Sequence, residues 1–204
     1  MRSVISLTFC LLMLVVVCGL AAAQTAPIDG IDARSDAAEL AGKLSSPDPL
    51  VRQRSAEALA RLAAVSQRKM VEGYQLEEKN KEVRLALDWA LYRMGKSETL
   101  YRVVHELDSG RQQQAMGYLA EVDSPDVLYP FLRKSNNPPR VTAGLLKALG
   151  HIGDAQTLEL MKPYRESTQP YVAEAAETAC DQIEKRLGEA ATPTPGRPRT
   201  VAKP

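Results

Sequence analysis

The side chains in this sequence that could carry chemistry are few and far apart. His105 and His151 are the two histidines of the chain. A protein metal site needs several ligands that converge on one point, and two histidines in distant segments do not meet that need. We therefore expect no metal and no other cofactor.

Motifs for nucleophilic or phosphate chemistry are also missing. The sequence contains no Gly-x-Ser-x-Gly, no glycine-rich phosphate loop and no Cys-x-x-Cys pair. The carboxylates of Glu77 and Glu78, and of Glu174 and Glu177, have the spacing of a solvated helix face. We predict no catalytic residue and a protein that is not an enzyme.

The first 23 residues have the composition of an export signal. Residues 1–3 carry one positive charge, residues 4–20 are almost wholly apolar, and residues 21–23 are alanines. Small residues at that point favour cleavage there. Two alternatives remain: an uncut leader of this length could span a bilayer and anchor the protein, and Cys18 could be a lipidated N-terminus. We predict an exported protein, periplasmic or secreted.

Removal of that leader would leave 181 residues, enough for one domain. Cys180 would then have no partner for a disulfide, so we expect it in a packed core. Of the 26 basic residues only Arg2 lies in the leader, so 25 basic residues balance 25 acidic ones. A nucleic-acid surface needs a basic excess, and we predict no nucleic-acid partner.

Internal repetition is the strongest signal. Five segments align without gaps, begin at positions 51, 83, 111, 141 and 172, and recur at intervals of 28 to 32 residues. Offsets 0, 4, 8 and 11 of each segment fall on one helical stripe. The stripes are Val51, Ser55, Leu59 and Leu62; Val83, Leu87, Leu91 and Met94; Arg111, Ala115, Leu119 and Val122; Val141, Leu145, Leu149 and Ile152; Val172, Ala176, Cys180 and Ile183. Offset 7 is alanine in four segments and Tyr118 in the third. Arg111 breaks the apolar pattern, so the third repeat should be the loosest.

A second amphipathic helix is expected before each of these segments. The apolar positions are Leu40 and Leu44, Met70 and Tyr74, Leu100 and Val104, Leu128 and Leu132, Leu158 and Met161. Proline-, glycine- and asparagine-rich breakers separate the two helices in most pairs. No stretch alternates with the period of a strand. The fold is predicted to be all-α, a right-handed solenoid of about five helix pairs.

Two stretches resemble the HEAT-repeat family, particularly its short bacterial form, which is also found in phycobilin lyases. Residues 47–52 and 58–62 look like that family's turn and second helix, and residues 148–154 look like its link to the next repeat. The resemblance covers residues 35–187. It implies paired antiparallel helices stacked into a curved rod, with the second helices lining the concave face, and it implies no single activity.

The family also supplies two tests. HEAT-fold deoxyhypusine hydroxylase binds iron through repeated His-Glu pairs, whereas this sequence has only His105-Glu106, so the iron site is not carried over. A lyase role is disfavoured because chromophore attachment happens inside the cell. Arg52 and Arg84 occupy a position where the family often carries an arginine, and we expect them to bond an adjacent turn.

The sequence divides into four parts. Residues 1–23 are the predicted signal, 24–34 a linker, 35–187 the repeat domain and 188–204 a proline-rich tail. The three basic residues of the tail outnumber its one glutamate. The tail is predicted to be disordered, since it has too few apolar residues to offset ordering, and is either a tether to an anionic surface or a solvated end.

One helix carries a second apolar stripe. Leu85, Trp89 and Tyr92 project opposite the core stripe of the second segment, and a helix that is apolar on both sides should be covered on both sides. The same offsets in the next two segments are Gln113, Gly117 and Ala120, then Ala143, Lys147 and Gly150. The aromatic residues beside this mostly small floor resemble a groove. We predict that Leu85, Trp89 and Tyr92 anchor a partner, with coverage by neighbouring helices or the N-terminal segment as the alternative.

The sequence therefore predicts a non-catalytic scaffold or adaptor in an extracytoplasmic compartment, which binds a protein or peptide on its concave face. One alternative is a lyase-like or cofactor-modifying enzyme on the same scaffold, which a bound chromophore or metal would reveal. The other is a structural module that associates with itself, which would show a concentration-dependent size.

Overall fold

The computed structural model describes residues 31–191, and the side chains of residues 36–190. This part of the chain forms α-helices and short 3-10 turns and contains no strand, which confirms the all-α prediction. The helices are α1 (Ile31–Lys43), α2 (Pro49–Arg61), α3 (Arg68–Glu77), α4 (Lys81–Arg93), α5 (Leu100–His105), α6 (Gln112–Leu119), α7 (Tyr129–Leu132), α8 (Pro139–Ile152), α9 (Ala155–Arg165) and α10 (Pro170–Ala191). The 3-10 turns are η1 (Val65–Gln67), η2 (Ser97–Thr99), η3 (Glu106–Asp108) and η4 (Pro125–Leu128).

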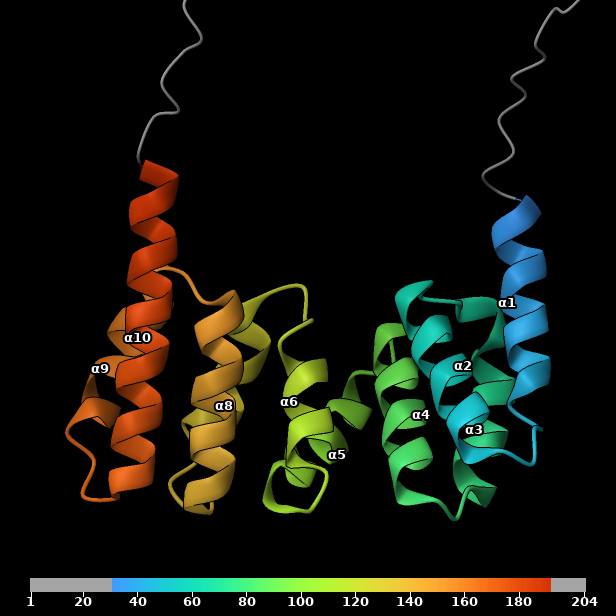
Figure 1. Ribbon diagram of the computed structural model, residues 1–204, viewed down its shortest axis with the longest axis horizontal. Coiled ribbons are helices and arrows are strands. Elements are labelled where there is room, and N and C mark those ends of the chain that lie inside the picture. Colours follow the sequence, from blue (N-terminus) through green and yellow to red (C-terminus); the bar gives the residue numbers. More distant parts are fainter. Residues whose placement is uncertain (1–30, 192–204) are drawn as a thin grey trace, which may run out of the picture.

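The helices pack as successive antiparallel pairs, from α1 with α2 to α9 with α10. The even-numbered helices form one row in which each contacts the next, and Figure 1 shows this row from α2 to α10. We call the surface of this row the even-helix face, and the side formed by the odd-numbered helices the odd-helix side. Stacked helix pairs are the solenoid that the repeats predicted, while its handedness and number of repeats stay predictions.

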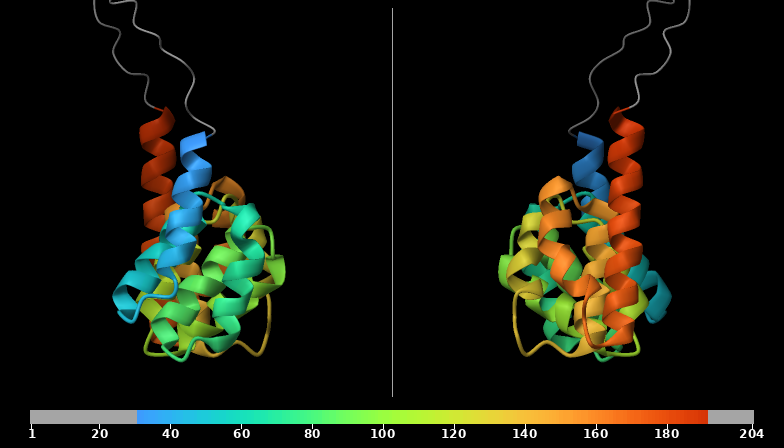
Figure 2. Two further views of the ribbon diagram at one scale, coloured as in Figure 1. Left: turned by 90° about the vertical axis from the view of Figure 1, so that its right-hand side faces the viewer. Right: turned by 90° about the vertical axis from the view of Figure 1, so that its left-hand side faces the viewer.

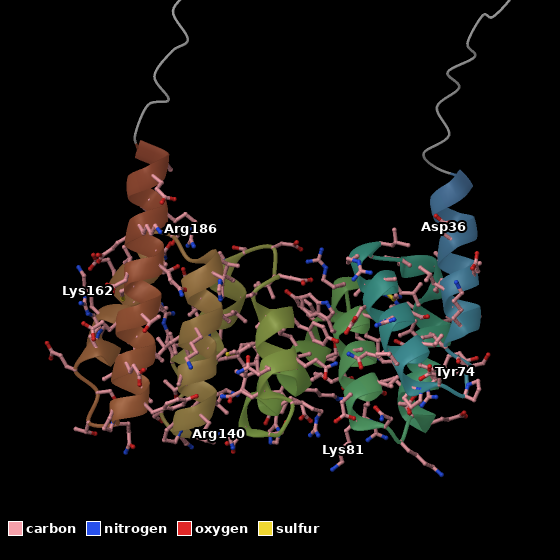
Figure 3. The ribbon with its side chains drawn as sticks, in the orientation of Figure 1. Asp36, Tyr74, Lys81, Arg140, Lys162 and Arg186 are labelled. Carbon is pink, nitrogen blue, oxygen red and sulfur yellow. The ribbon has the colours of Figure 1, made fainter. Side chains whose placement is uncertain are left out.

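The two end helices extend beyond the row at the same edge. Figure 2 shows α1 and α10 projecting together past the turns that link one pair to the next. In Figure 3, Asp36 on α1 and Lys162 on α9 mark opposite ends of the rod. The two ends of the described chain therefore leave from one edge, separated by the length of the row.

Side chains just before two of the second helices cap their first turns. The Asp48 carboxylate accepts a hydrogen bond from the Leu50 amide at 2.9 Å, and Pro49 occupies the first helical turn. The Asn80 side chain accepts one from the Val83 amide at 2.9 Å. Side chains that bond these free amides stabilise a helix start, and proline fits there because its missing N–H would be unpaired anyway.

The predicted stripes form the core in most repeats but not at the N-terminal end. The stripe positions of α4, and of α10, are buried. In the first repeat, Val51 is 36% and Leu62 46% exposed, whereas Ser55 and Leu59 of the same stripe are buried. Met70 is also wrong as a core position, since α3 buries Val71 and Gln75 instead.

The approach of α8 to α10 depends on small residues. A Cβ built on Gly150 would lie 3.0 Å from the Cα of Ala179, and Cys180 is buried nearby as predicted. The Arg186 guanidinium, labelled in Figure 3, donates hydrogen bonds to the carbonyls of Gly150 and Gly153. Gly150 therefore serves helix packing in this pair.

The predicted structural role of the two arginines is confirmed. Arg52 donates from Nε and Nη2 to the Glu78 carboxylate at 2.8 and 3.0 Å, and from Nη1 to the Ser46 carbonyl. Arg84 donates to the Glu78 carbonyl. The Arg52 guanidinium lowers the pKa of Glu78 below its ordinary value. These bonds tie the turn before α2 to the turn between α3 and α4.

Two predicted boundaries differ from the structure. Helix α1 already begins at Ile31, inside the range predicted as linker, and α10 continues to Ala191, past the predicted start of the tail. The predicted signal at residues 1–23, and most of the predicted tail, lie outside the described residues. Within the described range, no helix has both the length and the apolar character needed to cross a bilayer.

Candidate binding groove on the even-helix face

The structure covers most of the predicted anchor stripe. Leu85 and Trp89 are each only 2% exposed, and Tyr92 is half-buried. The reason is that α4 is surrounded by α2, α3, α5 and α6. The prediction that Leu85 and Trp89 present an open apolar surface is therefore wrong, and coverage by neighbouring helices holds for both.

Aromatic rings provide that cover on the side of α6. The rings of Trp89 and Tyr118 stack at 5.5 Å between centroids with an interplanar angle of 3°, and Trp89 stacks on Tyr92 at 5.4 Å. The Arg93 guanidinium lies 5.7 Å from the indole centroid. Stacked aromatic pairs and a cation over the ring add to the energy of burial. Trp89 is thus a core residue between two helices.

The polar end of Tyr118 links three helices. Its hydroxyl donates to Glu57 Oε1 on α2 at 2.7 Å and accepts from Gln114 Nε2 at 2.8 Å. The Gln114 amide also donates to the Glu82 carbonyl on α4. Burial, and then the bond to Glu57, raise the pKa of Tyr118 above its ordinary value. The network fixes the Tyr118 ring across the outside of α4.

These rings also set the spacing of the row. Helix α4 approaches α2 closely, whereas α4 and α6 approach each other less closely, as Figure 1 shows. Alanine occupies the equivalent of Tyr118 in the other four segments. The stacked rings of Trp89 and Tyr118 therefore act as a wedge between α4 and α6. Tyr118 was missed as a site residue, although its size at a position otherwise held by alanine was the signal.

Two adjoining hollows lie beside this wedge. The first, of about 300 Å³, spans α2, α4 and α6, and the second, of about 220 Å³, lies between α6 and α8. They share Gln113 and Gly117, and we call them together the even-helix groove. It is lined by Glu57, Arg61, Trp89, Gln113, Gln114, Met116, Gly117, Tyr118, Ala120, Glu121, Lys147, Ala148 and His151.

Gly117 forms an open place in the groove floor. It lies within α6, and a Cβ built there would meet no atom within 4 Å. Ala120 and Lys147 line the groove as the sequence predicted, but Ala143 and Gly150 are buried in packing. The predicted small floor is therefore correct for α6 and wrong for those two positions of α8.

The groove offers hydrogen bonds and apolar contact. Gln113 is exposed, and its side-chain amide has no hydrogen-bond partner within the described part of the chain, so this amide can both donate to and accept from a ligand. Arg61 and Glu121 place opposite charges on the same groove. An amide beside aromatic and methyl groups suits an extended peptide, whose backbone alternates donors and acceptors.

Groups for catalysis are not assembled here. His151 lines the groove, while His105 lines hollows on the odd-helix side. Residues 36–190 contain no group of three or more His, Cys, Asp or Glu side chains that could hold a metal ion. Burial raises the pKa of the Cys180 thiol, which disfavours the reactive thiolate. The groove can bind a ligand, and we assign no chemical reaction to it.

Comparison with known proteins gives only distant likenesses. No protein-family model and no curated protein matches this chain. A solved structure of an engineered protein aligns at 20% identity over 76% of this chain and 81% of its own length, with a TM-score of 0.36. Human deoxyhypusine hydroxylase in complex with glycerol aligns at 16% identity over 73% and 74%, with a TM-score of 0.30. Neither score supports an inference about activity.

Proposed function

We propose that this protein is a non-catalytic, HEAT-like binding scaffold that holds a peptide segment of a partner protein in the even-helix groove. The observation that carries the proposal is the open floor at Gly117 beside the unpaired amide of Gln113. Glycine inside a helix lowers helix stability by about 0.5–1 kcal/mol relative to alanine. An exposed glycine that packs against no neighbour is explained if a partner's backbone approaches that point.

The predicted leader is the basis for the proposed location of the protein. An apolar leader followed by alanines directs export, so we place the scaffold in the periplasm or outside the cell. Mass spectrometry of the protein from separated cell fractions should find a mature form that begins near Gln24. An intact N-terminus in the soluble cytoplasmic fraction would contradict this placement.

The binding role is tested by cross-linking at the groove. A photo-reactive amino acid at position 113 should capture a partner in cells, and the same group at position 185, on the exposed side of α10, serves as the control. Gly117→Leu should fill the groove and abolish capture, whereas the single added methyl of Gly117→Ala should weaken capture only in part. Gly117→Ala is compatible with folding because nothing lies within 4 Å of the new Cβ, and the melting temperature of Gly117→Leu tests whether the larger side chain is accommodated.

Each result has a defined meaning. A partner that cross-links at position 113 but not at 185, and is lost only in Gly117→Leu, supports the scaffold and locates its surface. Equal cross-linking at both positions, or capture that Gly117→Leu does not change, removes the groove as the binding site. Thermal melts of each variant exclude loss of folding as the cause.

A further inference from the structure

A separate hollow of about 630 Å³ lies on the odd-helix side, between α5, α7 and residues 133–138. It exists because both helices are short, six residues in α5 and four in α7. Pro138 and Pro139 follow, and proline cannot continue a helix interior. The Asn137 side chain donates to the Phe131 carbonyl at 2.6 Å, which holds the loop over the end of α7.

The walls of this hollow combine aromatic rings and cations. Tyr101 is 55% exposed, and its ring lies 6.4 Å from that of His105 between centroids. The Lys134 ammonium lies 5.0 Å from the ring centroid of Tyr101 and 5.6 Å from that of Phe131. Buried Val104 and Val141 give the hollow an apolar floor. Tyrosine is enriched among the residues that dominate binding energy at interfaces, so an exposed Tyr101 beside an apolar floor and a cation suits a binding surface.

Cations outnumber carboxylates in the lining of this hollow. Arg133 and Lys134 both line it, and between positions 127 and 153 the sequence has no aspartate or glutamate. Arg133 and Lys134 form no ion pair with a carboxylate of residues 36–190. Asp108 is the one carboxylate among the lining residues. Two neighbouring cations without carboxylate partners leave room for an anionic ligand.

We propose that this hollow is a second binding site, which takes an acidic peptide segment of a partner protein. Carboxylates of the segment contact Lys134 and Arg133, and a large apolar side chain packs against Tyr101 and Phe131. The site shares no lining residue with the even-helix groove, so it does not depend on the function proposed for that groove.

A peptide fits these walls better than a nucleic acid. The chain as a whole carries a formal charge of only +1, whereas phosphate binding relies on many cations. Single-stranded bases bind by stacking on open aromatic faces, and here Lys134 already lies over the rings of Tyr101 and Phe131. A carboxylate can meet that ammonium without displacing it from the rings.

Fluorescence anisotropy with defined probes tests the site. The probe is a labelled peptide of Asp, Glu and Phe, and two matched peptides carry Asn and Gln for the acids or Ala for Phe. Lys134→Glu should weaken binding of the acidic probe by about tenfold or more, the effect of losing roughly 1.4 kcal/mol. Lys185→Glu makes the same charge change on α10 and should leave binding within about twofold.

Further variants separate the contributions. Tyr101→Ala should weaken binding of the Phe-containing probe more than that of the Ala-containing one. Gly117→Leu, which fills the other groove, should leave binding unchanged. Equal binding of the acidic and amide probes, equal losses in Lys134→Glu and Lys185→Glu, or tighter binding of single-stranded RNA or anionic vesicles through Lys134 would each overturn the proposal. Circular dichroism melts of every variant check that it folds.

Discussion

Trp89→Ala distinguishes a core residue from a partner anchor. The indole is 2% exposed and stacks on Tyr118 and Tyr92, so the substitution removes nearly the whole ring from packed surroundings. Truncation of a buried tryptophan lowers the free energy of unfolding by about 3–5 kcal/mol. For a domain of this size each kcal/mol shifts the melting temperature by roughly 2–4 °C, which gives a fall of roughly 6–20 °C.

The assay is thermal and urea unfolding followed by circular dichroism at the helix band. Trp89 is the only tryptophan of the chain, so the variant lacks the fluorophore, while in the wild type its emission should be blue-shifted and protected from quenchers. Tyr171→Ala is the matched aromatic control. Tyr171 is 41% exposed and contacts the Lys147 ammonium, so its loss should cost less than about 1 kcal/mol.

The opposite result would refute the structural reasoning. If folded Trp89→Ala loses less stability than Tyr171→Ala, the indole is not enclosed between α4 and α6. That result would support the prediction from the sequence that Trp89 is exposed and binds a partner. Ready quenching of wild-type fluorescence by a neutral quencher would point the same way.

For three other substitutions the structure predicts the direction of the change in stability. Gly117→Ala should raise the free energy of unfolding by about 0.5–1 kcal/mol, because the new methyl meets no atom within 4 Å; a loss in urea melts would place a neighbour over α6. Asp154→Ala should cost about 0.5–2 kcal/mol at neutral pH, since Asp154 and Thr157 form a capping box at α9. The hydrogen bond from the Thr157 amide lowers the pKa of Asp154 below its ordinary value. This stabilisation is therefore present above the unfolded-state pKa and is lost as pH falls through the folded-state pKa, which urea midpoints measured against pH test. For Asp88, burial raises the pKa more than Arg102 lowers it, so protonation favours the folded state. The wild type should gain stability relative to Asp88→Asn as pH falls from the raised pKa of Asp88 toward the ordinary value of an aspartate. A loss of stability relative to Asp88→Asn as pH falls would contradict the burial of this carboxylate.

The fold was predictable because its information is local and repeated. Helix starts at Pro49, Lys81, Gln112, Pro139 and Pro170 fall within two residues of the segment starts read from the sequence. Helical periodicity and proline breakers depend only on residues close together in the sequence. Because five similar segments carry the same pattern, the helical repeat could be recognised from the sequence. The errors lie in the first two repeats, where the structure leaves Val51, Leu62 and Met70 exposed.

The site was less predictable because it depends on contacts between helices. Periodicity identified the second apolar stripe of α4, but only the three-dimensional packing brings Tyr118 over Trp89, and Glu57 to the Tyr118 hydroxyl. The lengths of α5 and α7 were missed for a similar reason. Their ends depend on loop bonds such as the one from Asn137 to Phe131, which no apolar period encodes.

Both candidate surfaces occur where the repeat is least regular. The aromatic wedge widens the row at α4 and α6, and the short α5 and α7 leave a hollow on the other side. A regular solenoid, with alanine at position 118 and longer helices in place of α5 and α7, would have neither the groove nor the hollow. Positions where a sequence departs from the regular pattern of its fold are often functional sites. Since the two surfaces share no lining residue, Gly117→Leu and Lys134→Glu should have additive effects on stability, and each should weaken binding only at its own surface. A double variant whose stability differs from the sum by more than about 0.5 kcal/mol would show that the surfaces are coupled through the third repeat.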